Sequence, residues 1–171
     1  SSFDLGDGDN VLKADVTVKN VKTGSGDDVI NLSGGHEGVY FNFNSETAKD
    51  GSWSWSYADL YRNSGESNVT AGSGDDTITL TGTVESKTYD NSWYSGSKGS
   101  GFGYGRIYGE DGNDTIDASK TSAAYELNGG AGDDIIYGAQ EYTGEIHGGA
   151  GDDTILFGKG EIASNLSLIH I

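Results

Sequence analysis

A nine-residue pattern that recurs six times constrains this 171-residue chain more than any other feature. Each copy keeps Gly at its fourth place, Asp or Asn at its fifth and sixth places, and an aliphatic residue at its eighth place. The copies are LGDGDNVLK from Leu5, TGSGDDVIN from Thr23, AGSGDDTIT from Ala71, GEDGNDTID from Gly109, GGAGDDIIY from Gly129 and GGAGDDTIL from Gly148. Because every copy must build the same local unit, the fold has to be one that repeats.

Two columns of apolar residues accompany the pattern. One column is the eighth place of each copy, and the other stands two residues before each copy. The seventh place is always β-branched, which favours strands. We therefore predict a strand before and a strand after each loop. The predicted core consists of Leu12, Ile30, Ile78, Ile116, Ile136, Ile155, Phe3, Val21, Val69, Ile107, Leu127 and Ile146.

The spacing of the copies indicates a winding chain. Successive copies begin 18, 48, 38, 20 and 19 residues apart. A spacing of 18 to 20 residues suits one turn of a solenoid with two strands and two connections. The gaps of 48 and 38 residues then contain insertions. Since 38 is also twice 19, a turn without the motif around residues 96–103 stays an alternative for the second gap.

With these loops the chain resembles the RTX, or hemolysin-type, calcium-binding family, whose nonapeptide reads GGxGxDxUx. The resemblance implies an all-β fold, a right-handed parallel β-roll. Only alternate half-turns carry the motif here, so we expect calcium loops along one edge and ordinary turns along the other. We expect one calcium-binding domain, residues 1–171, with insertions at about 44–68 and 84–104 that the resemblance does not cover.

The resemblance also implies which residues bind calcium. The sixth place supplies a side-chain oxygen, the fifth place a backbone carbonyl or the shape of the turn, and the fourth-place Gly lets carbonyl oxygens turn toward one point. The sixth-place residues are Asn10, Asp28, Asp76, Asp114, Asp134 and Asp153, with Asn10 the weaker, uncharged ligand. The fifth-place residues are Asp9, Asp27, Asp75, Asn113, Asp133 and Asp152. The fourth-place residues are Gly8, Gly26, Gly74, Gly112, Gly132 and Gly151.

Calcium also explains why the carboxylates are tolerated. Two carboxylates about 5 Å apart in successive turns repel by roughly 3 kcal/mol at an effective dielectric near 20. A divalent ion reverses the sign of this term, so we expect calcium binding and folding to be coupled, with up to about five ions between six loops. Asx-type turns would explain a single copy. They do not explain six copies in register, and carbonyl-rich loops suit magnesium less well.

Two segments that include the insertions, residues 39–61 and 87–105, hold 12 of the 18 aromatic residues. VYFNFNSETAKDGSWSWSYADLY alternates on both sides of a Gly-containing turn, which predicts a β-hairpin with residues 39–44 paired to 53–58. We interpret KTYDNSWYSGSKGSGFGYG as a long loop. Both insertions leave consecutive turns at one edge, so they can form one patch. We expect this patch to cover the flank of the roll; the alternative is a contact surface for a glycan, a cell surface or another subunit, through Trp53, Trp55 and Trp93.

Composition excludes several function classes. The net charge is −17, which disfavours binding to nucleic acid or to an anionic membrane. Only 33% of residues are hydrophobic, 29 are Gly and none is Cys, so calcium has to supply part of the stability that disulfides and a large core would otherwise give. No run of 18 apolar residues and no catalytic motif occurs, so we expect neither membrane insertion nor enzymatic activity.

The expected function is that of a secreted, calcium-binding structural module at the cell surface of a bacterium. RTX-like proteins are typically exported unfolded by type I secretion and fold in millimolar calcium, which matches the weak sites of extracellular modules. We expect a self-assembling subunit of a surface layer or filament, stacked head to tail because neither end shows a polar cap, or an adhesin segment. The alternative is the C-terminal module of a secreted enzyme or toxin.

Overall fold

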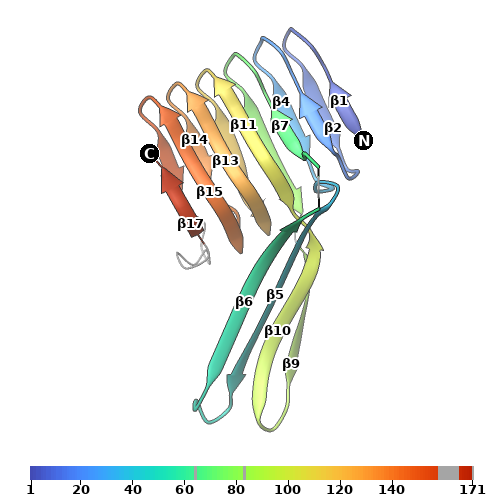
Figure 1. The fold of residues 1–171 in the computed structure, drawn as a ribbon, viewed down its shortest axis with the longest axis vertical. Helices are drawn as coiled ribbons and strands as arrows, with labels where there is room; N and C mark the ends of the chain where they lie inside the picture. The colour runs from blue at the N-terminus through green and yellow to red at the C-terminus, as the bar shows by residue number, and fades with distance from the viewer. Residues whose placement is uncertain (64, 83, 158–165, 171) are drawn as a thin grey trace.

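The computed structural model describes residues 1–63, 65–82, 84–157 and 166–170, and this part of the chain is built of strands, turns and loops. Two parallel sheets form a roll, and a third, antiparallel sheet projects from it as an arm (Figure 1). None of the described residues forms a helix long and apolar enough to span a membrane.

In both sheets of the roll, neighbouring strands come from successive turns of the chain. Sheet A has the order β1 (Ser2–Asp4), β3 (Asn20–Lys22), β7 (Asn68–Thr70), β11 (Tyr104–Asp111), β13 (Ala123–Ala131), β15 (Tyr142–Ala150) and β17 (Leu166–His170). Sheet B has the order β2 (Val11–Ala14), β4 (Val29–Leu32), β8 (Thr77–Gly82), β12 (Thr115–Thr121), β14 (Ile135–Tyr137) and β16 (Thr154–Leu156).

The chain alternates between the two sheets, one strand of each per turn, as a β-roll requires. Equivalent residues stack in register from turn to turn: Ile30 pairs with Ile78, and Ile78 with Ile116. The two apolar columns meet between the sheets. Ten of the twelve predicted core residues are buried, and Phe3 and Ile155 are only partly buried because they lie in the outermost turns. The predicted β-roll and core are therefore confirmed.

The 38-residue gap contains no additional turn of the roll. Strand β7 pairs directly with β11, and β8 pairs directly with β12. The residues between β8 and β11 instead leave the roll. Loops three and four are therefore neighbours, and the alternative of a motif-free turn around residues 96–103 is wrong.

The two insertions form one four-stranded sheet, in the order β6 (Ser54–Arg62), β5 (Val39–Ala48), β10 (Tyr94–Phe102) and β9 (Glu85–Asp90). The second insertion is thus a hairpin and not the long loop that we expected. Its strand β10 alternates Ser, Lys and Gly, so it lacks the apolar period of a strand, and it is held by pairing with β5 and β9. The first hairpin has a different register from the expected one, because Asn44 pairs with Tyr57.

The base of the arm is anchored on the roll, and the rest projects away from it. Phe41 is fully buried, and its ring lies 6.2 Å from that of Tyr142 on β15. His36 is buried just before β5, and its Nδ1 accepts a hydrogen bond of 2.7 Å from the Gly105 N–H. Burial lowers the pKa of His36 to about 4, which keeps this ring neutral. Beyond this base the aromatic residues do not cover the core of the roll, in contrast to our expectation (Figure 1).

Candidate metal centre

All six motif loops lie along one edge of the roll, because each connects a strand of sheet A to the following strand of sheet B. We call this the loop edge. The arm leaves the opposite edge, where strands of sheet B return to sheet A (Figure 1). The predicted separation of motif loops from ordinary connections is therefore present in the structure.

The sixth-place carboxylates form a ladder along the loop edge. Asp28, Asp76, Asp114 and Asp134 are each only 1% exposed. In every case one carboxylate oxygen accepts the backbone N–H of the sixth-place residue in the preceding turn. These bonds run from Asn10 to Asp28 (2.8 Å), Asp28 to Asp76 (2.8 Å), Asp76 to Asp114 (2.8 Å), Asp114 to Asp134 (2.8 Å) and Asp134 to Asp153 (3.0 Å). The ladder joins all six loops.

The second oxygen of each ladder carboxylate has no protein partner. Five such atoms are buried without a hydrogen bond from the described residues: Oδ2 of Asp28, Asp76, Asp114, Asp134 and Asp153. A buried, unpaired carboxylate oxygen is costly unless a cation or a donor meets it. Hard oxygen ligands of this kind are those that calcium takes. The residues present therefore fit a row of calcium ions.

The calcium-free ladder is electrostatically unfavourable. Burial raises the pKa of Asp76 to about 6 and that of Asp114 to about 7, although the backbone N–H bond to each carboxylate acts in the opposite direction. Repulsion from the neighbouring ladder carboxylates adds to the rise. Burial also raises the pKa of Asp134. A cation at the unpaired oxygens would remove this penalty.

The fifth-place side chains form a second ladder that runs in the opposite direction. The Asp9 carboxylate accepts the Asp27 N–H at 2.9 Å, and the Asp133 carboxylate accepts the Asp152 N–H at 2.9 Å. Asp27, Asp75 and Asn113 each accept the N–H of the next turn in the same way. Unlike the sixth-place oxygens, none of these residues has a buried, unpaired oxygen. The side chains at the fifth place thus join neighbouring loops by hydrogen bonds, and the alternative of a ligating backbone carbonyl at this place stays a prediction.

The fourth place must be Gly for two separate reasons. At Gly112 the backbone φ is 124°, a conformation that residues with a Cβ rarely adopt. A Cβ on Gly112 would also lie 1.9 Å from the carbonyl oxygen of Gly74 in the turn before it. The fourth-place residues thus stack backbone on backbone, which brings successive loops close enough to share a ligand.

The first place differs between the two halves of the loop edge. In the last three loops it is Gly, and a Cβ on Gly129 would lie 2.3 Å from the unpaired Oδ2 of Asp134. In the first three loops it holds Leu5, Thr23 and Ala71. In the last three loops, Gly at the first place therefore keeps the space around the unpaired oxygen free of a side chain.

Asn10 departs from the ladder pattern in its chemistry. Its Nδ2 lies 2.6 Å from the Gly8 oxygen, 3.1 Å from the Gly6 oxygen and 3.0 Å from Asp28 Oδ1. All three partners are acceptors, so the amide acts as a donor there. In this arrangement Asn10 presents N–H groups to oxygens that a cation would otherwise neutralise, and its role as a weak, uncharged calcium ligand stays a prediction.

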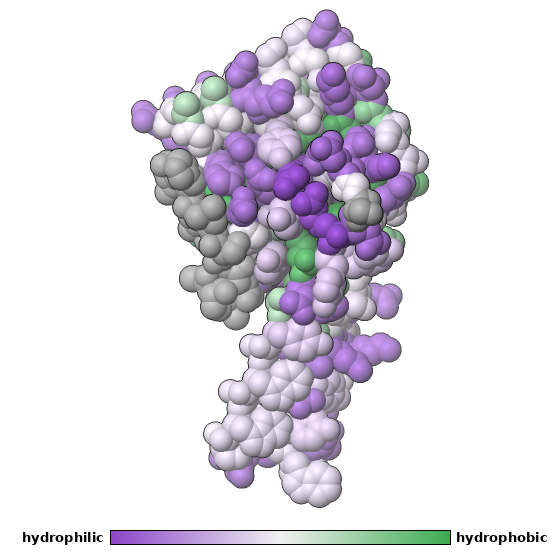
Figure 2. Space-filling model, viewed as in Figure 1, coloured by the Kyte–Doolittle hydropathy of each residue, from purple (hydrophilic) through white to green (hydrophobic). Residues whose placement is uncertain are grey.

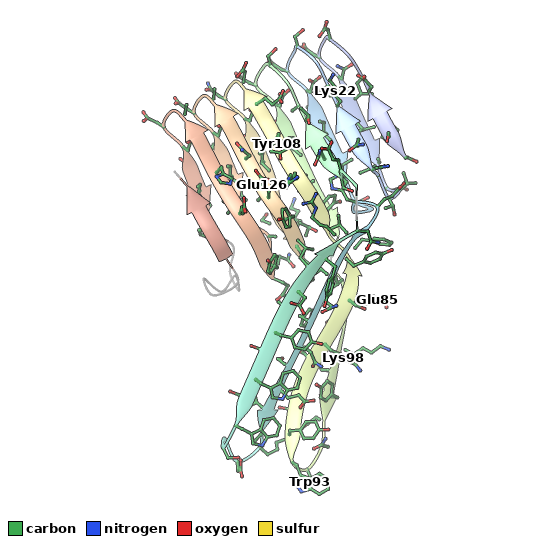
Figure 3. All side chains as sticks on the ribbon, viewed as in Figure 1. Lys22, Glu85, Trp93, Lys98, Tyr108 and Glu126 are labelled. Carbon is green, nitrogen blue, oxygen red and sulfur yellow. The ribbon has the colours of Figure 1, made fainter. Side chains whose placement is uncertain are left out.

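A second group of metal-ligating side chains lies outside the loops, and sequence reasoning missed it. Ligand atoms of Glu126, Glu145 and His147 lie within 4.8 Å of one another on sheet A. Glu126 also accepts hydrogen bonds from Arg106 (3.1 Å) and Tyr108 (3.4 Å), so the group is held as a network of charged and polar side chains (Figure 3). The sequence does contain a signal for this group, because Glu126 and Glu145 each stand three residues before the first residue of a motif copy.

Comparison with known families agrees with this geometry. A model of the RTX calcium-binding nonapeptide repeat matches four segments, residues 61–81, 106–120, 126–140 and 145–161. These contain the last four loops, and the first two loops, which have Leu5 and Thr23 at the first place and Asn10 on the ladder, lie outside them. The searches of curated proteins and of solved structures gave no match. RTX nonapeptide repeats bind calcium ions, so the loop edge is a calcium-binding edge.

Proposed function

We propose that this chain, a β-roll of RTX calcium-binding nonapeptide repeats, serves as an adhesin segment of a secreted bacterial protein, with the arm as its binding element. The roll folds on calcium and holds the arm away from itself. The arm then contacts a glycan at a cell surface. No catalytic role is proposed for either part.

The observation that carries this proposal is a row of exposed aromatic residues on one face of the arm. Side chains at alternate positions of a strand, and at paired positions of neighbouring strands, share a face. By this rule Trp53, Trp55, Tyr57, Tyr61, Tyr40 and Phe102 all lie on one face, which we call the arm face. Each is between 42% and 53% exposed, and Trp93 at the tip is 78% exposed.

Such exposure of aromatic side chains is unusual for a face with a purely structural role. Large aromatic groups left in water on one surface indicate a contact site. The rings are also preorganised: those of Trp55 and Tyr57 lie 6° from parallel with centroids 6.1 Å apart. Along the visible side of the arm the residues have intermediate hydropathy, whereas strongly hydrophilic residues gather over the roll (Figure 2). Flat, half-exposed rings of this kind suit the C–H face of a sugar ring.

Calcium dependence supports an extracellular role. The ladder carboxylates oppose winding in the absence of a cation, and millimolar calcium is an extracellular condition. A chain whose folded state is less stable at low calcium is suited to export through a type I system. RTX repeats are typical of secreted proteins, which is the basis on which we assign this localisation.

A second candidate is self-assembly into a surface layer or filament. It is favoured by the edge of sheet B, where Val11 on the outermost strand β2 leaves 68% of its surface exposed. Another roll could extend the sheets there. A calcium-binding module of a secreted enzyme or toxin would need the same roll. The loop edge therefore does not distinguish such a module from a self-assembling subunit. Electron microscopy with calcium and with EGTA tests self-assembly, which requires calcium-dependent polymers.

The adhesin proposal is tested on a glycan array with the whole chain in calcium and in EGTA. We expect binding in calcium only, and loss of binding in the double variant Trp55→Ala and Tyr57→Ala. Phe157→Ala is the matched control, because Phe157 is a 43% exposed aromatic residue outside the arm. Circular dichroism in calcium verifies that each variant is folded. Binding that survives in the double variant, or a wild type that binds no glycan, would reject the proposal.

A further inference from the structure

The centre of the arm face is polar and lies between two aromatic rows. Pairing across the sheet aligns Tyr57, Asn44, Lys98 and Lys87 in one row, and Asp59, Asn42, Ser100 and Glu85 in the next row toward the roll. The row on the side of the tip contains Trp55 and Tyr89, and the row on the side of the roll contains Tyr61, Tyr40 and Phe102. All members of these two rows except Asp59, together with Phe43 and Gly99, line a groove with a volume of about 430 Å³. This volume lies within the range of small-ligand sites.

Two lysines stand directly opposite each other in this groove. Lys98 on β10 pairs with Lys87 on β9, and both line the groove. Like charges at paired positions destabilise a sheet. Neither lysine forms an ion pair with a described residue, although Glu85 lies in the next row. The pair therefore presents two unneutralised ammonium groups to solvent.

The positive groove is a local feature of a very acidic chain. The whole chain carries −17, but residues 39–62 and 85–102 contain five acidic and four basic residues, so these segments contribute only −1. The negative charge is concentrated elsewhere, above all at the calcium-binding edge. An anionic ligand would thus meet Lys87 and Lys98 together, beside the Glu85 carboxylate that also lines the groove and away from the acidic calcium-binding edge.

The rest of the groove offers directed hydrogen bonds. Asn44 Oδ1 and a Glu46 carboxylate oxygen each lie 2.9 Å from the Tyr89 hydroxyl, whose single hydrogen they share, so Asn44 is partnered from beside the groove. The Tyr89 ring crosses over Gly96, where a Cβ would lie 2.6 Å from the ring. Asn42 also lines the groove, and its Oδ1 is buried without a hydrogen bond from the described residues.

From these observations we infer that the groove binds an acidic sugar unit, whose negative group pairs with Lys87 and Lys98 while its ring packs beside Tyr57. The inference rests on the proposed function of the arm and adds the chemical class of its ligand. An acidic peptide would be held by sheet edges and would not need the aromatic rows. In Figure 3, Lys98 and Glu85 lie between Trp93 at the tip and the base of the arm.

The test is isothermal titration of the whole chain, in calcium, with short oligogalacturonides, which carry carboxylates. Cello-oligosaccharides of equal length are the neutral probe, heparin-derived oligosaccharides the sulfated probe, and an oligoglutamate the acidic peptide. We expect one or both acidic oligosaccharides to bind at least about ten times more tightly than the neutral probe, with an affinity that falls as salt rises. Which of the two binds more tightly identifies the acid as a carboxylate or a sulfate.

Two variants remove the charge and replace the lysine with a shorter, neutral polar side chain. We expect Lys98→Gln and Lys87→Gln each to weaken the binding of acidic oligosaccharides about three- to tenfold and to leave the affinity for the neutral probe unchanged. Lys22→Gln, an exposed lysine on the roll, is the matched control and should have no effect (Figure 3). All three sites are exposed, so folding in calcium should be unaltered by circular dichroism.

The outcomes separate this inference from the proposed function. Equal binding of neutral and acidic oligosaccharides, or unchanged affinity in both lysine variants, would overturn the inference while the arm remains a glycan-binding element. Tighter binding of oligoglutamate than of any oligosaccharide would overturn both. Loss of acidic but not neutral binding in the lysine variants would establish the class of ligand.

Discussion

Asp133 and Asp134 are adjacent, carry the same charge and differ only in what surrounds them. Asp134 is buried and has an unpaired Oδ2, whereas Asp133 is exposed and accepts the Asp152 N–H. Replacing either residue by Asn removes one charge and keeps one acceptor oxygen, so both hydrogen-bond ladders can persist. The pair of variants therefore isolates the effect of a charge at the calcium-binding position.

The expected loss for Asp134→Asn follows from binding linkage. A site with a dissociation constant near 10⁻⁴ M, as in extracellular modules, stabilises the folded state by about 2.7 kcal/mol when calcium is a hundredfold higher. Asp134 is hydrogen-bonded to the loops of both Asp114 and Asp153, so its replacement removes one or two calcium sites. The stabilisation lost is then about 3 to 5 kcal/mol. For a domain of this size that lowers Tm by about 6 to 20 °C in 10 mM calcium. Asp133→Asn should cost only about 0.5 kcal/mol.

Without calcium the effect should change sign. Neutralising one ladder carboxylate removes a repulsion of at most about 3 kcal/mol from its neighbours, so Asp134→Asn should not destabilise the chain in EGTA. The assay is thermal unfolding by circular dichroism in both conditions, with calcium stoichiometry by equilibrium dialysis. Equal losses for the two variants, or a loss at Asp134 that persists in EGTA, would refute the assignment of the sixth place to calcium.

Three further changes test other features of the loop edge. The raised pKa of Asp76 and of Asp114 means that the folded, calcium-free roll binds extra protons, so its stability falls as pH rises from about 4 to 7. Calcium must displace these protons, so the midpoint of calcium binding to the folded roll should move to higher calcium as the pH is lowered from 8 to 5.5. A midpoint independent of pH would contradict this. Glu110 has a φ of 77°, so Glu110→Gly should be more stable than Glu110→Ala by about 1 kcal/mol in chemical unfolding. Asn10→Asp replaces the donor at the first loop with a carboxylate and should add one bound calcium by equilibrium dialysis, with a lower stability in EGTA.

The calcium-binding edge could be predicted in large part because its neighbours are copies of one another. Ile30, Ile78 and Ile116 each stand at the same place relative to their motif copy, so the sequence shows them as one column. In the roll, residues at equal places of successive turns pair with one another. The roles of individual residues within each loop were harder to predict from the sequence. The donor role of Asn10 depends on which end of its amide faces Asp28, and residue type alone does not determine that orientation.

The arm could not be predicted to the same degree. Its central contact pairs β5 with β10, so that Asn44 lies beside Lys98, and no repeat relates these two strands. Strand β10 contains Gly96, Gly99 and Gly101, so it shows no apolar alternation. Gly99 instead makes room for the Phe43 ring, a reason for its presence that only the paired strands reveal.

The sequence by itself determined the winding, the twelve core positions and the edge at which calcium binds, since each depends on interactions between identical units one turn apart. The tertiary structure alone decided how the insertions join, which aromatic residues stay in water and that Lys87 faces Lys98. The physical reason is the range of the contacts. In the roll every neighbour is another copy of the same loop, whereas in the arm each neighbour is a unique segment whose alignment is set by backbone pairing and by the few buried side chains at its base.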